Sequence, residues 1–315
     1  GELSQTPPPS FRMENGSYDK PREAVAPHIP TVLRTGNTSV PPDIAPPNER
    51  SSGRRSALAT WLASRDNPLT HRVWVNRLWQ GHFGMGLVPN ANDLGTQTAA
   101  ATLPGLYDWM TSEFVDGGFA SKRLHRLIVT SSVYRQSSSE SAETSIDVAS
   151  VPYSLYPRRR LSSERIRDAW LMASGQLNDS MYGPGTRPEI PPNFTGYEWK
   201  VSEPPQRVRR SIYLFAKRNL PYPLMSAFDF PDMHESCGCR TITTIAPQAL
   251  MLLNNGIVLE AGRKLATRSC DEATSADPAQ RIQRAWQIAF GRPATEREIN
   301  AGLHFLSEQH APFFH

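Results

Sequence analysis

Hydrophobic residues recur with helical spacing along most of the chain. In residues 54–63, Leu58, Trp61 and Leu62 are three and four positions apart, which predicts an amphipathic helix. The same spacing predicts further helices over residues 67–80, 104–116, 121–132, 161–177, 247–253, 258–268 and 278–290.

Two of the predicted helices have clear starting signals. Asn67 can cap the helix over residues 67–80, and Pro68 suits a first helical position. Near the end of the chain, Thr295 and Glu298 have the spacing of a capping box, which predicts a last helix from this point.

Between the helices, the pattern predicts little regular structure. Residues 211–215 (SIYLF) are the best candidate for a strand. Residues 1–53 contain ten prolines and residues 183–205 contain six, so both segments are expected to be irregular. We therefore expect a mainly α protein: a single multi-helix domain over residues 54–315, long proline-rich segments and a few short strands. Residues 1–53 are expected to pack on its surface.

Composition narrows the class of protein. Hydrophobic residues make up 38% and charged residues 20%, which excludes a membrane bundle and a wholly disordered chain. No apolar run approaches the roughly 20 residues of a transmembrane helix. The net charge of +4 over 315 residues is too weak to favour a nucleic-acid partner.

The cationic residues are strongly biased towards arginine, with 29 Arg and 5 Lys. The planar guanidinium fork suits carboxylates, phosphates and sulfates. An anionic partner and simple Arg–carboxylate pairing both explain this bias.

The first candidate site follows the predicted helix over residues 67–80. Trp79 could stack on a sugar or a base, and Asn76 and His82 could bind a polar ligand. A buried polar network joining two helices and a loop is the alternative interpretation. The polar members of this cluster are Asn76, Arg77, His82, Asn92 and Asp93.

A second cluster lies between residues 158 and 168. Glu164 and Asp168 are four residues apart, on one face of a predicted helix. Paired carboxylates can perform acid–base chemistry if burial separates their pKa values. The neighbouring arginines favour ion pairing instead, which keeps both groups ionised.

A third cluster lies in residues 228–240, which combine Asp229, His234, Cys237 and Cys239. The spacing fits no standard zinc pattern, so we expect no metal here, and His234, Cys237 and Cys239 are the only metal candidates. A nucleophilic cysteine beside His234 is a second possibility, and anchoring of the loop is the simplest one. Three cysteines do not make a disulfide framework.

Familiar catalytic motifs are missing from the sequence. It has no Walker loop, no GxGxxG, no GxSxG, no HExxH and no CxxCH haem-attachment motif. These absences remove the common enzyme classes that such motifs identify.

The order of its motifs makes the chain resemble the planctomycete-secreted domain of unknown function, the domain of unknown function 1553 family. The run NPLTHRVWVNRLWQGHFGMGLV (67–88) carries the central motif. The similarity covers most of residues 25–308. Besides the central motif it includes residues 25–33, 92–95, 106–138, 158–177, 209–232, 239–255 and 289–299. Leu94, Met110 and Thr111 depart from the usual pattern. The chain ends where another helical segment is expected, which suggests C-terminal truncation.

The resemblance implies a secreted, periplasmic or cell-envelope protein, with haem only in a separate cytochrome c-like domain of a longer polypeptide. No cofactor is expected in this chain. The family has no established reaction, so the resemblance yields candidates only. The candidate catalytic residues are Asp93, Asp168, Asp229 and His82, and the candidate ligand-binding residues are Asn76, Arg77, Trp79, Asn92, Arg165, Arg167 and Arg240.

Two functions follow from these patterns. The first is binding or processing of an anionic polysaccharide, with catalysis left open. The alternative is a non-catalytic module that binds another envelope protein within a larger multidomain secreted protein.

Overall fold

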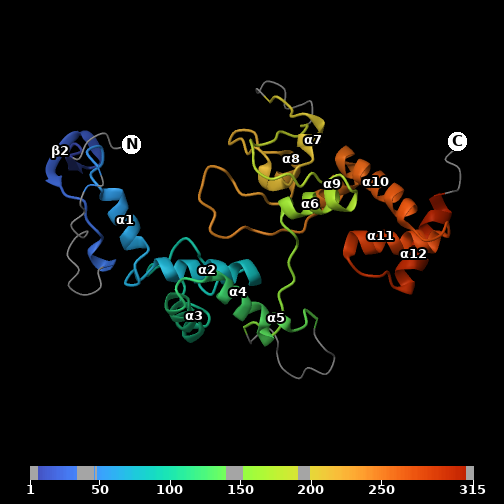
Figure 1. The fold of residues 1–315 in the computed structure, drawn as a ribbon, viewed down its shortest axis with the longest axis horizontal. Helices are drawn as coiled ribbons and strands as arrows, with labels where there is room; N and C mark the ends of the chain where they lie inside the picture. Colours follow the sequence, from blue (N-terminus) through green and yellow to red (C-terminus); the bar gives the residue numbers. More distant parts are fainter. Residues whose placement is uncertain (1–5, 34–45, 47, 140–151, 191–198, 310–315) are drawn as a thin grey trace. The chain divides into compact units, whose positions relative to one another are not determined.

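The computed structural model describes residues 6–33, 46, 48–139, 152–190 and 199–309 (Figure 1). The chain forms two compact units, Gly1–Arg158 (unit 1) and Arg159–His315 (unit 2). Helices dominate the described parts of both units, which confirms the predicted mainly α class. In these parts, no helix has the length and apolar character needed to cross a bilayer.

Unit 1 begins with a β-hairpin and continues with helices. Its elements are β1 (Ser10–Glu14), β2 (Ser17–Val25), η1 (Thr31–Leu33), α1 (Arg54–Leu62), α2 (Thr70–Phe83), α3 (Pro104–Asp116), α4 (Ser121–Thr130) and α5 (Ser132–Arg135). β1 and β2 pair antiparallel across a turn at Asn15 and Gly16. Both turn residues have positive φ, 50° and 77°, as tight hairpin turns require.

The core of unit 1 lies where α2 packs against α3 and α4. α2 supplies Val75, Trp79 and Phe83, whose positions repeat every four residues along one side of the helix. The facing side chains are Tyr107, Met110 and Phe114 of α3 and Leu124 and Ile128 of α4. Burying each large apolar side chain contributes about 1.5–3 kcal/mol, so this cluster is the main source of stability in the unit.

The cap predicted at Asn67 is not at the helix end: α2 begins three residues later than expected, and its N-cap residue is Leu69. The Asn67 side-chain oxygen accepts from the backbone N–H groups of Leu69 and Thr70, at 2.9 and 2.8 Å. Asn67 and Pro68 therefore form the turn that leads into α2, and regular helix starts at Thr70.

Unit 2 is built around α6. Its elements are α6 (Ser163–Ala173), α7 (Pro204–Arg207), η4 (Ser211–Tyr213), α8 (Pro223–Ala227), α9 (Ala246–Asn254), α10 (Gly256–Glu272), α11 (Pro278–Phe290) and α12 (Glu296–Gln309). Helix α6 contacts α8, α10, α11 and η4. Leu171 of α6, Leu224 and Met225 of α8, Phe228, and Ala261 of α10 are buried.

The capping box predicted for the last helix is confirmed. The Thr295 N–H and hydroxyl donate to the Glu298 carboxylate, at 2.8 and 3.0 Å, and the Glu298 N–H donates back to the Thr295 hydroxyl at 3.3 Å. Helices also occupy the other segments predicted between residues 247 and 290.

The strand predicted over residues 211–215 is wrong. Residues Ser211–Tyr213 form a 3₁₀ turn, and only Leu214 makes an isolated bridge, to Thr186. The Asp168 carboxylate accepts from the Ser211 N–H at 2.8 Å and from its hydroxyl at 2.6 Å. The donor groups that a sheet ladder would need at Ser211 are therefore bound to Asp168, and the segment turns instead of extending.

Candidate functional site

In unit 1, Asn76 braces the loop that follows α2. Its amide nitrogen donates to the Val88 carbonyl at 3.0 Å, and its oxygen accepts from the Val88 N–H at 2.9 Å. The side chain is buried, with 1% of its surface exposed. A Cβ atom on Gly86 would lie 2.6 Å from both Asn76 amide atoms and from the Val88 carbonyl oxygen. This fit makes Asn76 a structural brace.

Trp79 belongs to the core of unit 1. Its ring stacks on Phe83 with centroids 4.3 Å apart, and its indole N–H donates to the Tyr153 hydroxyl at 3.0 Å. Only 4% of the residue is exposed. The indole therefore offers no free face on which a sugar could stack.

The other candidates of unit 1 make local contacts. His82 Nε2 lies 2.8 Å from Nδ1 of His125 on α4. Arg77 donates to the Asn92 side-chain oxygen at 3.3 Å, and Asp93 accepts from the Gly95 N–H at 2.8 Å. These contacts tie the end of α2 to α4 and shape the loop over residues 90–95.

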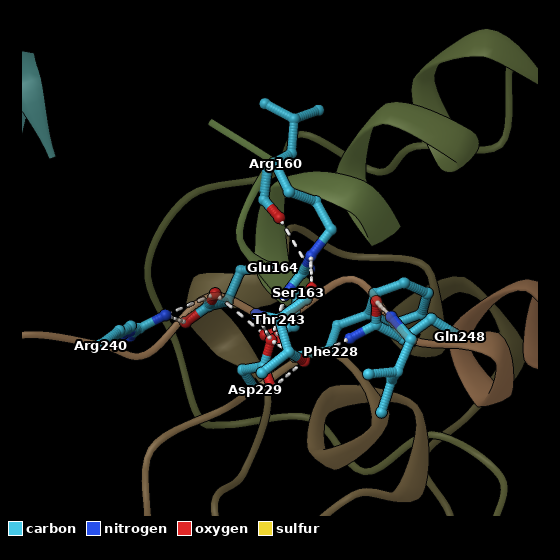
Figure 2. Close-up of polar contacts among 10 residues, drawn as sticks. Arg160, Ser163, Glu164, Phe228, Asp229, Arg240, Thr243 and Gln248 are labelled. Atoms are coloured by element: carbon cyan, nitrogen blue, oxygen red, sulfur yellow. Dashed lines mark hydrogen bonds and ion pairs between the residues drawn. The ribbon is translucent and has the colours of Figure 1, made fainter. Parts of the chain in front are cut away.

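In unit 2, Asp229 is the centre of a polar cluster (Figure 2). Its carboxylate accepts from the Thr243 N–H at 2.8 Å and from the Thr243 hydroxyl at 2.9 Å, and it pairs with the Arg160 guanidinium. Gln248 of α9 donates to the same Thr243 hydroxyl oxygen at 3.1 Å. Asp229 has a φ of 59°, a backbone conformation that Asp tolerates better than most residues.

Glu164 and Arg240 form the second ion pair of this cluster (Figure 2). One guanidinium nitrogen of Arg240 lies 2.8 Å from both carboxylate oxygens of Glu164. Glu164 lies in the first turn of α6, so this pair fixes the loop before α9 to the start of α6.

The pKa directions indicate that these carboxylates stay ionised. Burial alone would raise the pKa of Asp229, but the Thr243 N–H and hydroxyl and the Arg160 charge outweigh it and lower the pKa. Burial likewise opposes the lowering of the Glu164 pKa, which results from local backbone hydrogen bonding and from Arg240. A general acid needs a raised pKa, so the cluster is suited to holding the loop rather than to donating a proton.

Asp168 and Arg167 also act on the protein itself. Asp168 binds Ser211, as described above, and the buried Arg167 guanidinium donates to the carbonyl oxygens of Arg207 and Arg209 and to the Ser211 hydroxyl. Arg165, on the same helix, is exposed.

The metal candidates are His234, Cys237 and Cys239, and all three are exposed. Within the described residues, His, Cys, Asp and Glu side chains form no group of three or more that could hold a metal ion.

Unit 2 also contains a cavity of about 1180 Å³, which shares two helices with the polar cluster. Helix α6 contributes to both, because Ser163 and Glu164 lie in the cluster and Leu171 lines the cavity. Helix α9 does the same, with Gln248 in the cluster and Leu250 and Met251 on the cavity wall. The cluster therefore fixes two walls of the cavity.

Apolar and polar residues both line the cavity. Its apolar side chains include Leu171, Val208, Leu224, Leu250, Met251 and Ile257. Such a wall binds apolar groups through burial and van der Waals contact.

Polar and charged residues make up much of the rest of this wall. Tyr222 and Arg167 both line the cavity, and a phenol O–H can donate a hydrogen bond to an acceptor there. Burial raises the pKa of Tyr222, which keeps the phenol protonated. Arg207 pairs with Glu189, and Glu260 with Arg263, so both signs of charge occur around the cavity.

Among the candidate site residues predicted from the sequence, only Arg167 lines this cavity. One signal was present: residues 246–254 (APQALMLLN) are apolar on more than one side of the helix. Leu250 and Leu253 are 57% and 69% exposed in the structure. An apolar helix that does not bury all its sides indicates a surface that can bind a partner.

The chain belongs to the family described as "Protein of unknown function (DUF1553)", PSD1, which matches residues 54–306. This match confirms the resemblance drawn from the motifs. No curated protein and no solved structure matches the chain significantly.

Proposed function

We propose that this chain is a non-catalytic interaction module whose unit 2 cavity binds an apolar-bearing segment of a partner protein. The observation that carries the proposal is the cavity of about 1180 Å³, whose wall includes the apolar side chains of Leu171, Leu250 and Met251. A cavity that combines apolar side chains with polar groups is typical of sites that bind anchoring side chains of a partner.

The state of the candidate carboxylates supports a binding role. Asp168 and Asp229 accept several hydrogen bonds each from the protein, and Glu164 is paired with Arg240. These bonds stabilise the ionised forms. The carboxylates therefore support the cavity instead of acting in it.

The charge around the cavity favours a peptide over a polyanion. Arg207 is paired with Glu189, and Arg167 is committed to backbone carbonyl groups. A sulfated or uronate polymer needs a run of uncommitted cations, whereas a peptide needs apolar contacts and a few hydrogen bonds. The Tyr222 O–H is suited to donate to a backbone carbonyl of such a peptide.

The family resemblance supports a setting outside the cytoplasm, in a secreted or cell-envelope protein with further domains. In this setting the module would hold another envelope protein in place.

Selection from a random peptide library displayed on phage tests the proposal, with the purified chain as bait. We expect peptides rich in Leu, Ile, Phe or Trp to be enriched. The variant Leu250→Arg puts a charge on the cavity wall and is expected to weaken the selected peptides at least tenfold, about 1.4 kcal/mol.

Leu253→Arg is the matched control, because Leu253 lies on the same helix, is also exposed and does not line the cavity. It is expected to bind the selected peptides like the unaltered chain. A failure to enrich any peptide would contradict the proposal. The proposal would also be contradicted if the chain bound sulfated or uronate polysaccharides on a glycan array and the Leu250→Arg variant did not.

A further inference from the structure

The loop between Asp229 and Thr243 is closed at its base. The Asp229 carboxylate holds the Thr243 N–H and hydroxyl, and Arg240 within the loop is held by Glu164 of α6. The side chains between Asp232 and Cys237 are exposed. The loop thus has fixed ends and a solvent-facing tip, the form of an Ω-loop.

The tip carries two thiols one residue apart. Cys237 and Cys239 are both exposed, and neither is part of a disulfide in the structure. The Cys237 thiol donates to the Cys239 carbonyl oxygen across 3.3 Å, so its sulfur already lies beside the second cysteine. The backbone bends at Gly238 and Cys239, which shortens the separation of the two cysteines further.

This spacing is compatible with a disulfide. Residues two positions apart have Cα atoms at most about 7 Å apart when fully extended, and less where the backbone bends. A disulfide spans Cα separations of about 4.4–6.8 Å. The intervening residue is Gly238, which has no side chain to oppose closure of a small ring.

We infer that Cys237 and Cys239 form a redox-active dithiol that exchanges with disulfides in solution. One cysteine thiolate attacks a disulfide R–S–S–R, which breaks the S–S bond, forms a mixed disulfide and releases one thiolate. The second cysteine then attacks the mixed disulfide, closes the Cys237–Cys239 bond and releases the second thiolate. The pair loses two electrons and two protons, and R–S–S–R is reduced to two R–SH.

The exposure of the two cysteines and the small ring that they close indicate a disulfide that is easily reduced. A ring closed over one residue is strained, and strained or exposed disulfides are reduced easily. The pair therefore cycles between both states and is no structural crosslink. A metal site would require further ligands, and within the described residues no third donor group converges with the two cysteines.

Equilibration with mixtures of reduced and oxidised glutathione tests this inference on the intact chain. Remaining thiols are trapped by alkylation at each ratio, and the peptide that contains residues 237–239 is weighed by mass spectrometry. As the fraction of oxidised glutathione rises, we expect both cysteines to become unavailable to alkylation together, with no glutathione attached to the peptide. Both are expected to become available again when a reductant is added.

Three serine variants make the outcome decisive. Cys270→Ser removes an exposed cysteine on α10 and is expected to leave the transition of the pair unchanged. Cys237→Ser and Cys239→Ser are expected to carry one glutathione on the remaining cysteine instead. The inference is overturned if glutathione attaches separately to Cys237 and Cys239 in the unaltered chain. It is equally overturned if both stay alkylatable over the whole range of ratios.

Discussion

Three acceptor groups from one segment surround the guanidinium of Arg167. They are the carbonyl oxygens of Arg207 and Arg209 and the Ser211 hydroxyl. The side chain is only 5% exposed, so water cannot replace these bonds. The residue therefore fixes residues 207–211 against α6 and thereby holds part of the cavity wall.

We expect Arg167→Met to destabilise unit 2 by about 3 kcal/mol, because methionine fills much of the space but leaves the buried acceptors unpaired. Urea unfolding followed by circular dichroism measures the change. Arg165→Met is the control, since the exposed Arg165 is expected to change stability by less than about 0.5 kcal/mol. Equal effects of the two variants would disprove the role given to Arg167.

Asp229 makes stability depend on pH. Its pKa is lower in the folded chain than in the unfolded chain, because the bonds from Thr243 and Arg160 outweigh burial. The unfolded chain therefore takes up the proton first as pH falls. The stabilisation is present at neutral pH and is lost as pH decreases from about 5 through the folded-state pKa.

Asp229→Asn is expected to lower stability at pH 7 by about 1–2 kcal/mol, with the difference shrinking towards about pH 3. Because asparagine tolerates the positive φ of this position, the loss of stability results from removal of the charge and not from backbone strain. Denaturant unfolding at a series of pH values measures it. Asp179→Asn, on an exposed side chain, should show little difference at any pH. A pH-independent loss in Asp229→Asn would contradict this account.

Among the elements, α2 depends most on a side chain outside it. Asn67 satisfies the N–H groups of Leu69 and Thr70, which the first helical turn leaves without partners. Asn67→Ala is expected to cost about 1–2 kcal/mol, and Asn67→Asp less, because aspartate keeps the accepting oxygen. Thermal unfolding of unit 1 distinguishes the two. If aspartate proved as harmful as alanine, these two hydrogen bonds would not be the reason.

The helices could be predicted from the sequence because their signals are local. Leu58, Trp61 and Leu62 lie within α1, and Asn67 and Thr295 lie within three residues of the helices that they precede. The prediction of a strand over residues 211–215 was wrong because Asp168, more than forty residues away, binds the N–H and hydroxyl of Ser211. Local propensity contains no information about such a partner.

For the candidate site as well, the sequence reveals local features but not partners that are distant along the chain. The sequence singled out polar residues by type and spacing, and the structure gives Asn76, Asp168 and Arg167 bonding partners within their own unit. The cavity could not be predicted, since its wall combines α6, α8, α9 and α10 with loops between them. Only the fold brings these segments together.

At the scale of the whole molecule, each unit has buried side chains of its own. Phe83 lies in the core of unit 1, and Leu224 is buried in unit 2. We expect calorimetry to show two unfolding transitions, because cores of this kind can unfold separately.

Phe83→Ala is expected to cost about 3–5 kcal/mol and to lower one transition by roughly 10 °C. Leu224→Ala is expected to lower the other transition and to leave the first in place. A single transition that moves in both variants would show that the units unfold together.

Gly86 has a consequence for how this sequence can diverge. A side chain at position 86 would meet the Asn76 amide and also the backbone oxygen of Val88. Shortening Asn76 would remove the first obstacle but not the second, because every residue at position 88 has the same carbonyl group. A substitution at position 76 can therefore occur in evolution at the expense of stability. At position 86, no substitution elsewhere removes the contact of a new side chain with the carbonyl oxygen of residue 88. In distantly related sequences, Gly86 should therefore be retained more often than Asn76.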